Sequence, residues 1–272
     1  MTSTGMKPRD RQKSILSLLR VMQKEWRVEE LANELSVSEL TIRRDLNELG
    51  KNGNIIRTHG GCIASENGSF STIFYKEFER NIELKRTIGR EAASLIKPND
   101  TLLLGDGSTA FQLANYLDNC GPITVYTNNV AAIQELSRFE NNRLYILGGE
   151  YDHQYNMLFL KGSLSDRILE TLNFDLVIIG TDAISKNGHC LSKNEEVART
   201  NQIILRRGER KILIADHTKV EASGNVIYGR LSDFDLWITT AGIDKSQMDL
   251  FRKQTAIKEL AVDSSVNGKN LK

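Results

Sequence analysis

The chain has 272 residues, 40% of them hydrophobic and 26% charged, with a formal net charge of +1. These values exclude a disordered chain and a protein that coats nucleic acid through excess positive charge alone. No apolar run reaches the roughly 18 residues of a spanning helix, and the N-terminus lacks a signal-peptide core, so we expect a cytoplasmic protein without a membrane partner.

The length suits two domains, one of them small. Residues 1–61 carry 11 Lys and Arg against 8 Asp and Glu, a net +3, which leaves −2 for the rest. Binding through so few charges requires specific contacts or two copies acting together. The three cysteines lack paired spacing, so we expect reduced thiols and no metal site.

The first sixty residues show three amphipathic helical patterns. Apolar residues recur at helical spacing in two short runs: Ile15, Leu18, Leu19 and Met22, then Val28, Leu31, Ala32 and Leu35. A third helix is expected after Ser38, which can cap it, with Glu39 in its first turn. Three helices in about forty residues, the last two joined by a tight turn, indicate a helix-turn-helix.

The third helix is expected to bury Ile42, Leu46 and Leu49. The residues then left to point outward or sideways are Leu40, Thr41, Arg43, Arg44 and Asn47. An apolar tip beside two arginines suits a helix that meets a thymine methyl group together with guanines or phosphates. By itself, an Arg-Arg-Asp run is more typical of a solvated face with an ion pair, and the helix-turn-helix context favours contact with DNA.

A small β wing is expected next. Gly53 lies between two asparagines, residues 55–58 read IIRT, and Gly60 and Gly61 close the run. Arg57 and His59 can lie along a phosphate backbone, although a single loop histidine is more often a plain surface residue.

Residues 28–61, VEELANELSVSELTIRRDLNELGKNGNIIRTHGG, closely resemble the winged helix of the DeoR/GlpR family of bacterial transcription regulators. The resemblance implies that the TIRRDL helix enters the major groove and that the wing ends in a basic-His-Gly-Gly element. A departure is Arg27, where the family often has a capping Ser or Thr. The predicted DNA-binding domain spans residues 7–62, and its predicted contacts are Ser38, Leu40, Thr41, Arg43, Arg44, Arg57, His59 and Gly60.

A polar linker is predicted over residues 63–80. After it, apolar runs at residues 101–104, 123–127, 143–147, 175–180, 211–216 and 235–240 alternate with helical patterns. This alternation predicts a Rossmann-like α/β domain with a mainly parallel sheet over residues 81–260. Residues 261–272 read as a polar tail.

Ligands bind such sheets at the carboxyl ends of the strands, where this chain places five polar clusters. Each cluster alone reads as turn chemistry, but together they suit a phosphorylated polyol. Amides and hydroxyls after the first strand would hold the phosphate, Lys219 would add positive charge, and carboxylates would meet hydroxyl groups. The predicted ligand set is Asp106, Gly107, Ser108, Thr109, Thr127, Asn128, Asn129, Gly148, Gly149, Asp182, Glu195, Glu196 and Lys219. No ATP or NAD motif is present, so no cofactor is expected.

The fragments DGST, TVYTNN, YILGGE, IIGTDAI and ADHTK resemble, in order and spacing, the DeoR-type C-terminal sensor domain. The resemblance implies a fold related to ribose-phosphate isomerases and a phosphorylated sugar as effector. The first loop departs from the family pattern, with Gly105 where Asp often stands and Ser108 in place of Thr.

We therefore predict a regulator of double-stranded operator DNA, a repressor of a carbohydrate-utilisation operon, acting as a homo-oligomer under control of a sugar phosphate. The alternative is an isomerase-like enzyme that carries a DNA-binding domain, because a pocket with Asp182, Glu195, Glu196 and Lys219 could move a proton between adjacent carbons. Ala183 stands where the related isomerases tend to have a second acid, so we expect no enzymatic activity.

Overall fold

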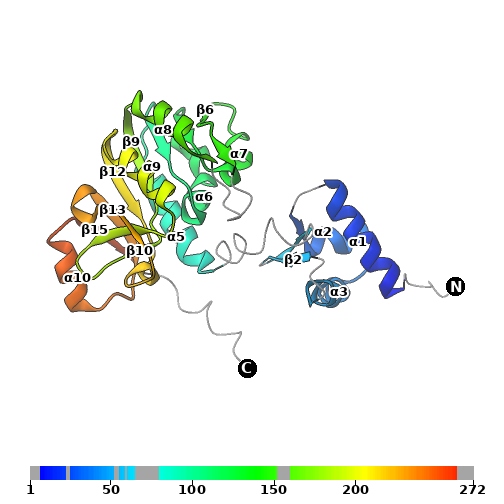
Figure 1. Ribbon diagram of the computed structural model, residues 1–272. Helices are drawn as coiled ribbons and strands as arrows, with labels where there is room; N and C mark the ends of the chain where they lie inside the picture. The colour runs from blue at the N-terminus through cyan, green and yellow to red at the C-terminus, as the bar shows by residue number, and fades with distance from the viewer. Residues whose placement is uncertain are drawn as a thin grey trace. The chain divides into compact units, whose positions relative to one another are not determined.

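The computed structural model describes residues 7–22, 25–51, 55–58, 60–64, 80–151 and 160–261 (Figure 1). These residues divide into two compact units, one that runs to Arg80 and one that starts at Asn81. The predicted tail beyond residue 261 and most of the predicted linker, residues 65–79, lie outside this description.

The first unit is a winged helix. Its elements in order are α1 (Pro8–Met22), β1 (Trp26–Arg27), α2 (Val28–Glu34), α3 (Glu39–Lys51), β2 (Ile55–Arg57) and β3 (Gly61–Ala64). The strands form an antiparallel sheet in the order β1-β3-β2. The three helices bury Ile15, Leu19, Leu31, Ile42 and Leu46 completely. The expected helix-turn-helix and wing are confirmed.

Two features of the wing differ from the expectation. Strand β3 continues to Ala64, past the residue 63 at which the linker was expected to begin, because Ile63 is 9% exposed and pairs with Ile56. Strand β1 was not expected, and Gly61 lets it approach, because a Cβ there would lie 1.9 Å from the carbonyl oxygen of Trp26.

The second unit is built on a seven-stranded sheet in the order β15-β14-β12-β9-β4-β5-β6, and every neighbouring pair is parallel. The strands are β4 (Thr101–Leu104), β5 (Thr124–Thr127), β6 (Arg143–Ile146), β9 (Phe174–Ile179), β12 (Gly208–Ile214), β14 (Leu236–Thr240) and β15 (Ala256–Leu260). The order reverses between β4 and β9, because the chain adds β5 and β6 on one side of β4 and then crosses to the other side.

Helices cover both faces of this sheet, as can be followed in Figure 1. One buried cluster joins the sheet to α5 (Ile82–Ala93), α6 (Ser108–Ala114) and α7 (Val130–Leu136). The other joins it to α8 (Ser163–Glu170), α9 (Glu195–Leu205) and α10 (Lys245–Arg252). Successive residues along the strands point alternately into the two clusters, so the sheet is buried on both faces. This confirms the Rossmann-like fold class.

Smaller elements extend the unit. Strands β10 (Ala183–Ile184), β11 (His189–Ser192) and β13 (Val226–Arg230) form an antiparallel sheet, and β7 (Glu150–Tyr151) pairs with β8 (Leu160–Lys161). The described residues of this unit also form 3-10 turns at η1 (Leu117–Cys120), η2 (His217–Lys219) and η3 (Leu231–Asp233). The three cysteines are free and buried. None of the helices that the structure describes has the length and apolar character needed to cross a membrane.

Candidate functional site

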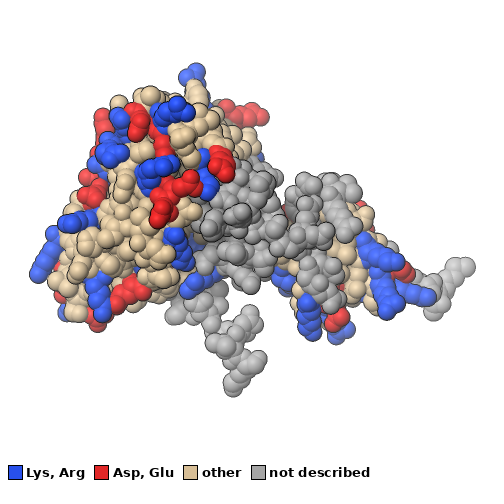
Figure 2. Space-filling model, viewed as in Figure 1, with Lys and Arg blue, Asp and Glu red and all other residues tan. Residues whose placement is uncertain are grey.

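The surface of α3 carries the predicted DNA contacts. Leu40 is 60% exposed, and Arg43 and Arg44 are exposed beside it. Figure 2 shows Lys and Arg side chains gathered over α1 and α3, with few acidic side chains among them. An exposed leucine within a basic surface fits the floor of a major groove better than it fits bulk water.

The two arginines of α3 have different environments. Nη2 of Arg43 lies 3.3 Å from Oε2 of Glu39, one helical turn earlier, and both side chains are about half exposed. Arg44 forms no ion pair with the residues that the structure describes. An exposed pair of this kind stabilises the helix by only about 0.3 to 0.5 kcal/mol. Arg43 can therefore leave Glu39 and bind a phosphate or a guanine instead.

Asp45 belongs to the core of the winged helix and not to its surface. It is 4% exposed and accepts hydrogen bonds from Nε and Nη2 of Arg11, and from Nε2 of Gln12 at 3.4 Å. The alternative interpretation of the Arg-Arg-Asp run, a solvated face with an ion pair, therefore does not hold for Asp45. A sequence signal existed, because Arg11 stands at helical spacing from Ile15 and Leu19 on the buried stripe of α1.

Ser38 directly precedes α3, and Thr41 lies in its first turn. Oγ of Ser38 accepts a hydrogen bond of 3.2 Å from the backbone N–H of Thr41, and the two hydroxyl oxygens lie 2.9 Å apart. Both side chains therefore stabilise the start of the helix, and few of their hydrogen-bonding positions remain for contacts with DNA. The expected cap is confirmed.

On the wing, Nη1 of Arg57 donates to the carbonyl oxygen of Arg43 at 3.4 Å, which ties the wing to α3. The carbonyl oxygen of Gly60 accepts from the N–H of Val28 at 2.8 Å. His59 lies outside the described residues.

The second candidate site lies at the carboxyl ends of β4 and β9, where the strand order reverses. The N–H of Gly105 donates to the carbonyl oxygen of Ile178 at 2.9 Å, so the residue that follows β4 still pairs with β9. A Cβ at Gly105 would lie 2.8 Å from Cγ2 of Ile179, so an Asp there would force that side chain to move. This is the position at which open parallel sheets bind ligands.

Gly107 shapes the loop before α6. Its φ of +94° is a conformation that residues with a Cβ rarely adopt, and nothing lies within 4 Å of where a Cβ would stand. The loop thus faces open space, with Ser108 half-buried and Thr109 8% exposed at the start of α6. The first-turn amides of a helix have no partner within the helix, so they can donate to an anion.

Two predicted ligand residues, Thr127 and Asn129, form hydrogen bonds with the end of β4 and with this loop. Oγ1 of Thr127 donates to the carbonyl oxygen of Leu104 at 2.8 Å, and Nδ2 of Asn129 donates to that of Gly107 at 3.1 Å. Thr127 and Asn129 are 0% and 1% exposed. Their described contacts are those of a scaffold that positions the loop.

Predicted residues that follow β5 and β6 contact the β7–β8 pair and the start of α8. Nδ2 of Asn128 donates to the carbonyl oxygen of Leu160 at 3.3 Å, and a Cβ at Gly149 would lie 2.4 Å from that of Lys161. The carbonyl oxygen of Gly148 accepts from Oγ of Ser165. These residues flank the loop at Gly107 from the far side of β5.

Two carboxylates lie at the reversal point itself. Burial, and the nearby charge of Asp182, raise the pKa of Asp106 to about 6. Oδ2 of Asp182 accepts from the N–H of Lys193 at 2.8 Å and from Oγ of Ser192 at 3.2 Å. Asp182 is thus held in place by β11, while Asp106 can carry a proton near neutral pH.

The remaining predicted groups lie around these loops. Oε2 of Glu196 lies 2.5 Å from Nζ of Lys161, a lysine that is 8% exposed and was not predicted as a site residue. Glu195 is exposed at the start of α9. Lys219, in η2 after β12, is half-buried and forms no ion pair with the described residues.

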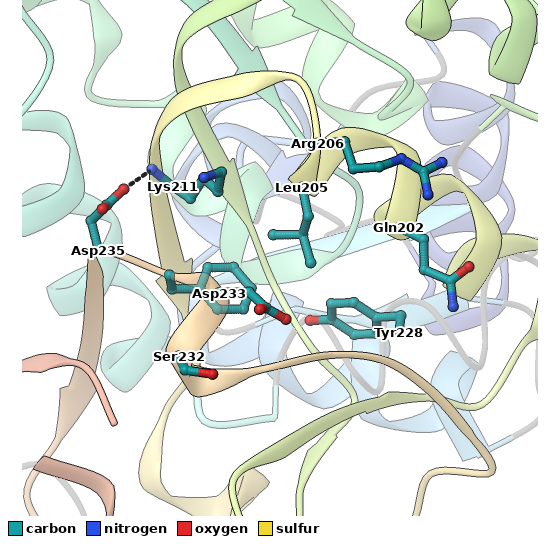
Figure 3. A pocket seen from close by; sticks show the side chains of 9 residues that line it. Gln202, Leu205, Arg206, Lys211, Tyr228, Ser232, Asp233 and Asp235 are labelled. Carbon is teal, nitrogen blue, oxygen red and sulfur yellow. Dashed lines mark hydrogen bonds between the residues drawn. The ribbon is translucent and has the colours of Figure 1, made fainter. Parts of the chain in front are cut away.

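A surface cavity of about 490 Å³ lies elsewhere (Figure 3). It is lined by the end of α9, by Tyr228 on β13 and by residues near the start of β14, where the N–H of Lys211 donates to Oδ2 of Asp235 at 2.7 Å. It lies toward the amino ends of β12 and β14, and none of the predicted ligand residues lines it.

A winged helix with an exposed basic α3, joined in one chain to a parallel α/β unit, defines a DNA-binding protein of the two-domain regulator class. Residues 11–67 match the family model of the DeoR-like helix-turn-helix domain, and residues 80–241 match that of the DeoR C terminal sensor domain. The chain belongs to the DeoR family of transcriptional regulators.

Three curated relatives illustrate the family. An HTH-type transcriptional regulator GlpR of Haloferax volcanii is 31% identical over 88% of this chain and 92% of its own. A lactose phosphotransferase system repressor of Staphylococcus aureus is 34% identical over 71% and 77%, respectively. An L-fucose operon activator of Haemophilus influenzae is 31% identical over 82% and 87%. All three are named as regulators, and none as an enzyme.

Solved structures are similar at a greater distance. Ribose 5 phosphate isomerase A of Neisseria gonorrhoeae aligns with a TM-score of 0.38 and 16% identity over 57% of this chain and 56% of that one. Translation initiation factor eIF-2B of Pyrococcus horikoshii aligns with a TM-score of 0.40 and 12% identity over 80% and 74%. Likenesses this weak say nothing about the chemistry of the site.

Proposed function

We propose that this regulator represses a carbohydrate-utilisation operon and that a phosphorylated sugar, bound at the carboxyl edge of the parallel sheet, controls its affinity for the operator. The observation that carries the proposal is that the open loop at Gly107, with the hydroxyls of Ser108 and Thr109, follows β4, while Lys219 follows β12, and both strands are neighbours of β9 in the parallel sheet. Amides, hydroxyls and an ammonium group suit a phosphate, and the neighbouring carboxylates suit sugar hydroxyls.

On the DNA side, Arg44, Arg43 and Leu40 of α3 read the major groove, and Arg57 and Gly60 of the wing approach the phosphate backbone. The exposure of the α3 side chains and the bond between Arg57 and α3 support this assignment. A single winged helix of low charge binds weakly, so we propose a homo-oligomer on repeated half-sites. The Staphylococcus aureus relative is named as the repressor of a lactose phosphotransferase system, which supports repression of a sugar system.

The ligand is tested by thermal unfolding of the full-length protein against phosphorylated sugars and the same sugars without phosphate. A ligand that binds the folded state alone raises its melting temperature, by the equivalent of about 2.7 kcal/mol at 100 times its Kd. We expect one sugar phosphate to act and its unphosphorylated form to be inactive, with the shift reduced in Ser108→Ala and Lys219→Ala. A panel without any shift would remove the sugar-phosphate part of the proposal.

Repression is tested separately. Duplexes that the full-length protein selects from a random pool define the operator, and a reporter under that operator reads the sign of control. Deletion of the regulator should raise reporter expression, and a fall would instead mark an activator. Incubation of the protein with the sugar phosphate that shifts it, followed by product analysis, should show no isomerisation.

A further inference from the structure

Asn81, the first residue of the α/β unit, contacts the loop that carries Lys219. Nδ2 of Asn81 donates a hydrogen bond of 3.1 Å to Oγ1 of Thr218 in η2. The two residues stand 137 positions apart in the sequence, so tertiary structure brings them together. Toward the N-terminus, the chain runs from Asn81 to the winged helix.

The backbone conformation of Asn81 differs from that of Asn129 and Asn194, which also precede helices. Asn129 and Asn194 precede α7 and α9 with extended backbones, and their side chains accept hydrogen bonds from first-turn amides. Asn81 precedes α5 in the left-handed conformation, with φ +57°, and makes no such cap. Its amide is directed to Thr218 and leaves the helix start without a side-chain cap.

Thr218 is fixed to β12 through Asp216. Oδ1 of Asp216 accepts from the N–H of Thr218 at 2.9 Å and from its hydroxyl at 2.5 Å. Asp216 is 0% exposed, and its Oδ2 has no hydrogen-bond partner in the described part of the chain. A displacement of η2 therefore moves Thr218 as part of a stiff unit.

A second copy of this turn lies at the start of α10, where the hydroxyl of Ser246 makes no hydrogen bond to another element among the described residues. Oδ1 of Asp244 accepts from the N–H of Ser246 at 2.9 Å and from its hydroxyl at 2.5 Å. Asp244 is exposed, and the hydrogen bonds that Ser246 makes with described residues stay within this turn. The turn itself thus does not require a partner like Asn81.

Helix α5 also contacts the other loop of the crevice. A Cβ at Gly89 would lie 2.8 Å from the backbone nitrogen of Leu113, so the backbones of α5 and α6 touch. Helix α6 begins at Ser108, in the proposed phosphate loop. Helix α5 is therefore attached to the phosphate loop through α6 and to the Lys219 loop through Asn81.

We propose that the hydrogen bond between Asn81 and Thr218 couples the ligand crevice to the chain segment that leads to the winged helix, with Asn81 as the positioning residue. The inference rests on the proposed function, because Lys219 enters it as a ligand group. A phosphate held between Lys219 and the loop at Ser108 shifts η2 relative to the start of α5, and the bond transmits that shift. The ligand thereby changes the population of DNA-competent arrangements.

Three variants of the full-length protein test the coupling. Asn81→Gly removes the amide and keeps the left-handed backbone accessible, and Thr218→Val removes the hydroxyl with little change of shape. Ser246→Ala is the matched control in the second turn. For each variant, the affinity for a selected operator duplex is measured with and without the sugar phosphate that shifts the wild type.

We expect all three variants to bind the duplex, and separately the sugar phosphate, within about threefold of the wild type. The ligand-induced change in duplex affinity should fall by about 3- to 10-fold in Asn81→Gly and in Thr218→Val, the range that one net hydrogen bond supplies. Ser246→Ala should keep the full response. An unchanged response in Asn81→Gly and Thr218→Val would overturn the proposal, and so would complete loss of sugar-phosphate binding in both, which would make them residues of the binding site.

A second measurement needs no sugar phosphate. Coupling is reciprocal, so duplex binding should change hydrogen exchange at residues 217–219 in the wild type and in Ser246→Ala, and not in the other two variants. An equal change in all four proteins would overturn the coupling while leaving the proposed effector intact. If no sugar phosphate binds the protein but this exchange pattern is present, the proposed effector is wrong and the coupling through Asn81 still holds.

Discussion

Asp45→Ala should selectively destabilise the winged helix. The substitution removes the buried carboxylate that accepts hydrogen bonds from Nε and Nη2 of Arg11, whose side chain is 10% exposed. Removing one member of a buried ion pair costs about 3 to 5 kcal/mol, and partial access of water to Arg11 reduces this to about 2 to 4. A unit of this size has a total stability of about 3 to 9 kcal/mol, so most of it can be lost.

The fluorescence of Trp26 reports on this unit. The chain has two tryptophans, and the other, Trp237, is in the α/β unit, so urea unfolding in a Trp237→Phe background follows the winged helix alone. Glu39→Ala is the control, because it removes an exposed pair and should cost no more than about 0.5 kcal/mol. A loss below about 1 kcal/mol in Asp45→Ala would refute the buried-pair interpretation, as would a loss equal to the control.

Three further outcomes are expected. Arg44→Ala should weaken binding of a selected duplex by about 1 to 3 kcal/mol in a titration, and an unchanged Kd would contradict a base contact. Asp106→Asn should stabilise the protein by about 1 to 2 kcal/mol at pH 7.5 and by nothing below about pH 4. The reason is that the folded-state pKa of about 6 exceeds the ordinary value near 4, so ionisation removes stability as pH rises through that window. A gain that does not depend on pH would show that the cause is not ionisation. Gly89→Ala should cost about 1 to 3 kcal/mol in thermal unfolding, because the methyl group meets backbone, and a neutral effect would disprove the close α5–α6 contact.

Periodicity predicted the helices because their buried residues are consecutive members of one stripe. Ile42, Leu46 and Leu49 of α3 recur at helical spacing, and all three are at most 3% exposed. The burial of Asp45 was not predicted, because it depends on Arg11, 34 residues earlier in the chain. Strand β1 was missed for the same reason, since two residues form a strand only when β3 pairs with them.

At the sheet edge, the sequence located the loops more reliably than it assigned individual roles. Residue type alone did not separate Ser108, beside open space, from Thr127, which is fully buried and bonded to Leu104. Both are hydroxyl residues that follow or end a strand. Asp216 was not predicted as a site residue, because its full burial, and the lack of a partner for its Oδ2 among the described residues, follow from tertiary packing alone.

The most direct measurement is the affinity of the full-length protein for a selected operator duplex. Fluorescence anisotropy monitors this affinity while each sugar phosphate of the panel is added. We expect one sugar phosphate to change the Kd by about 5- to 150-fold, the usual range of coupling between two sites, and its unphosphorylated form to change nothing. A sugar phosphate that stabilises the protein and yet leaves the duplex affinity unchanged would contradict the central claim that the α/β unit controls DNA binding.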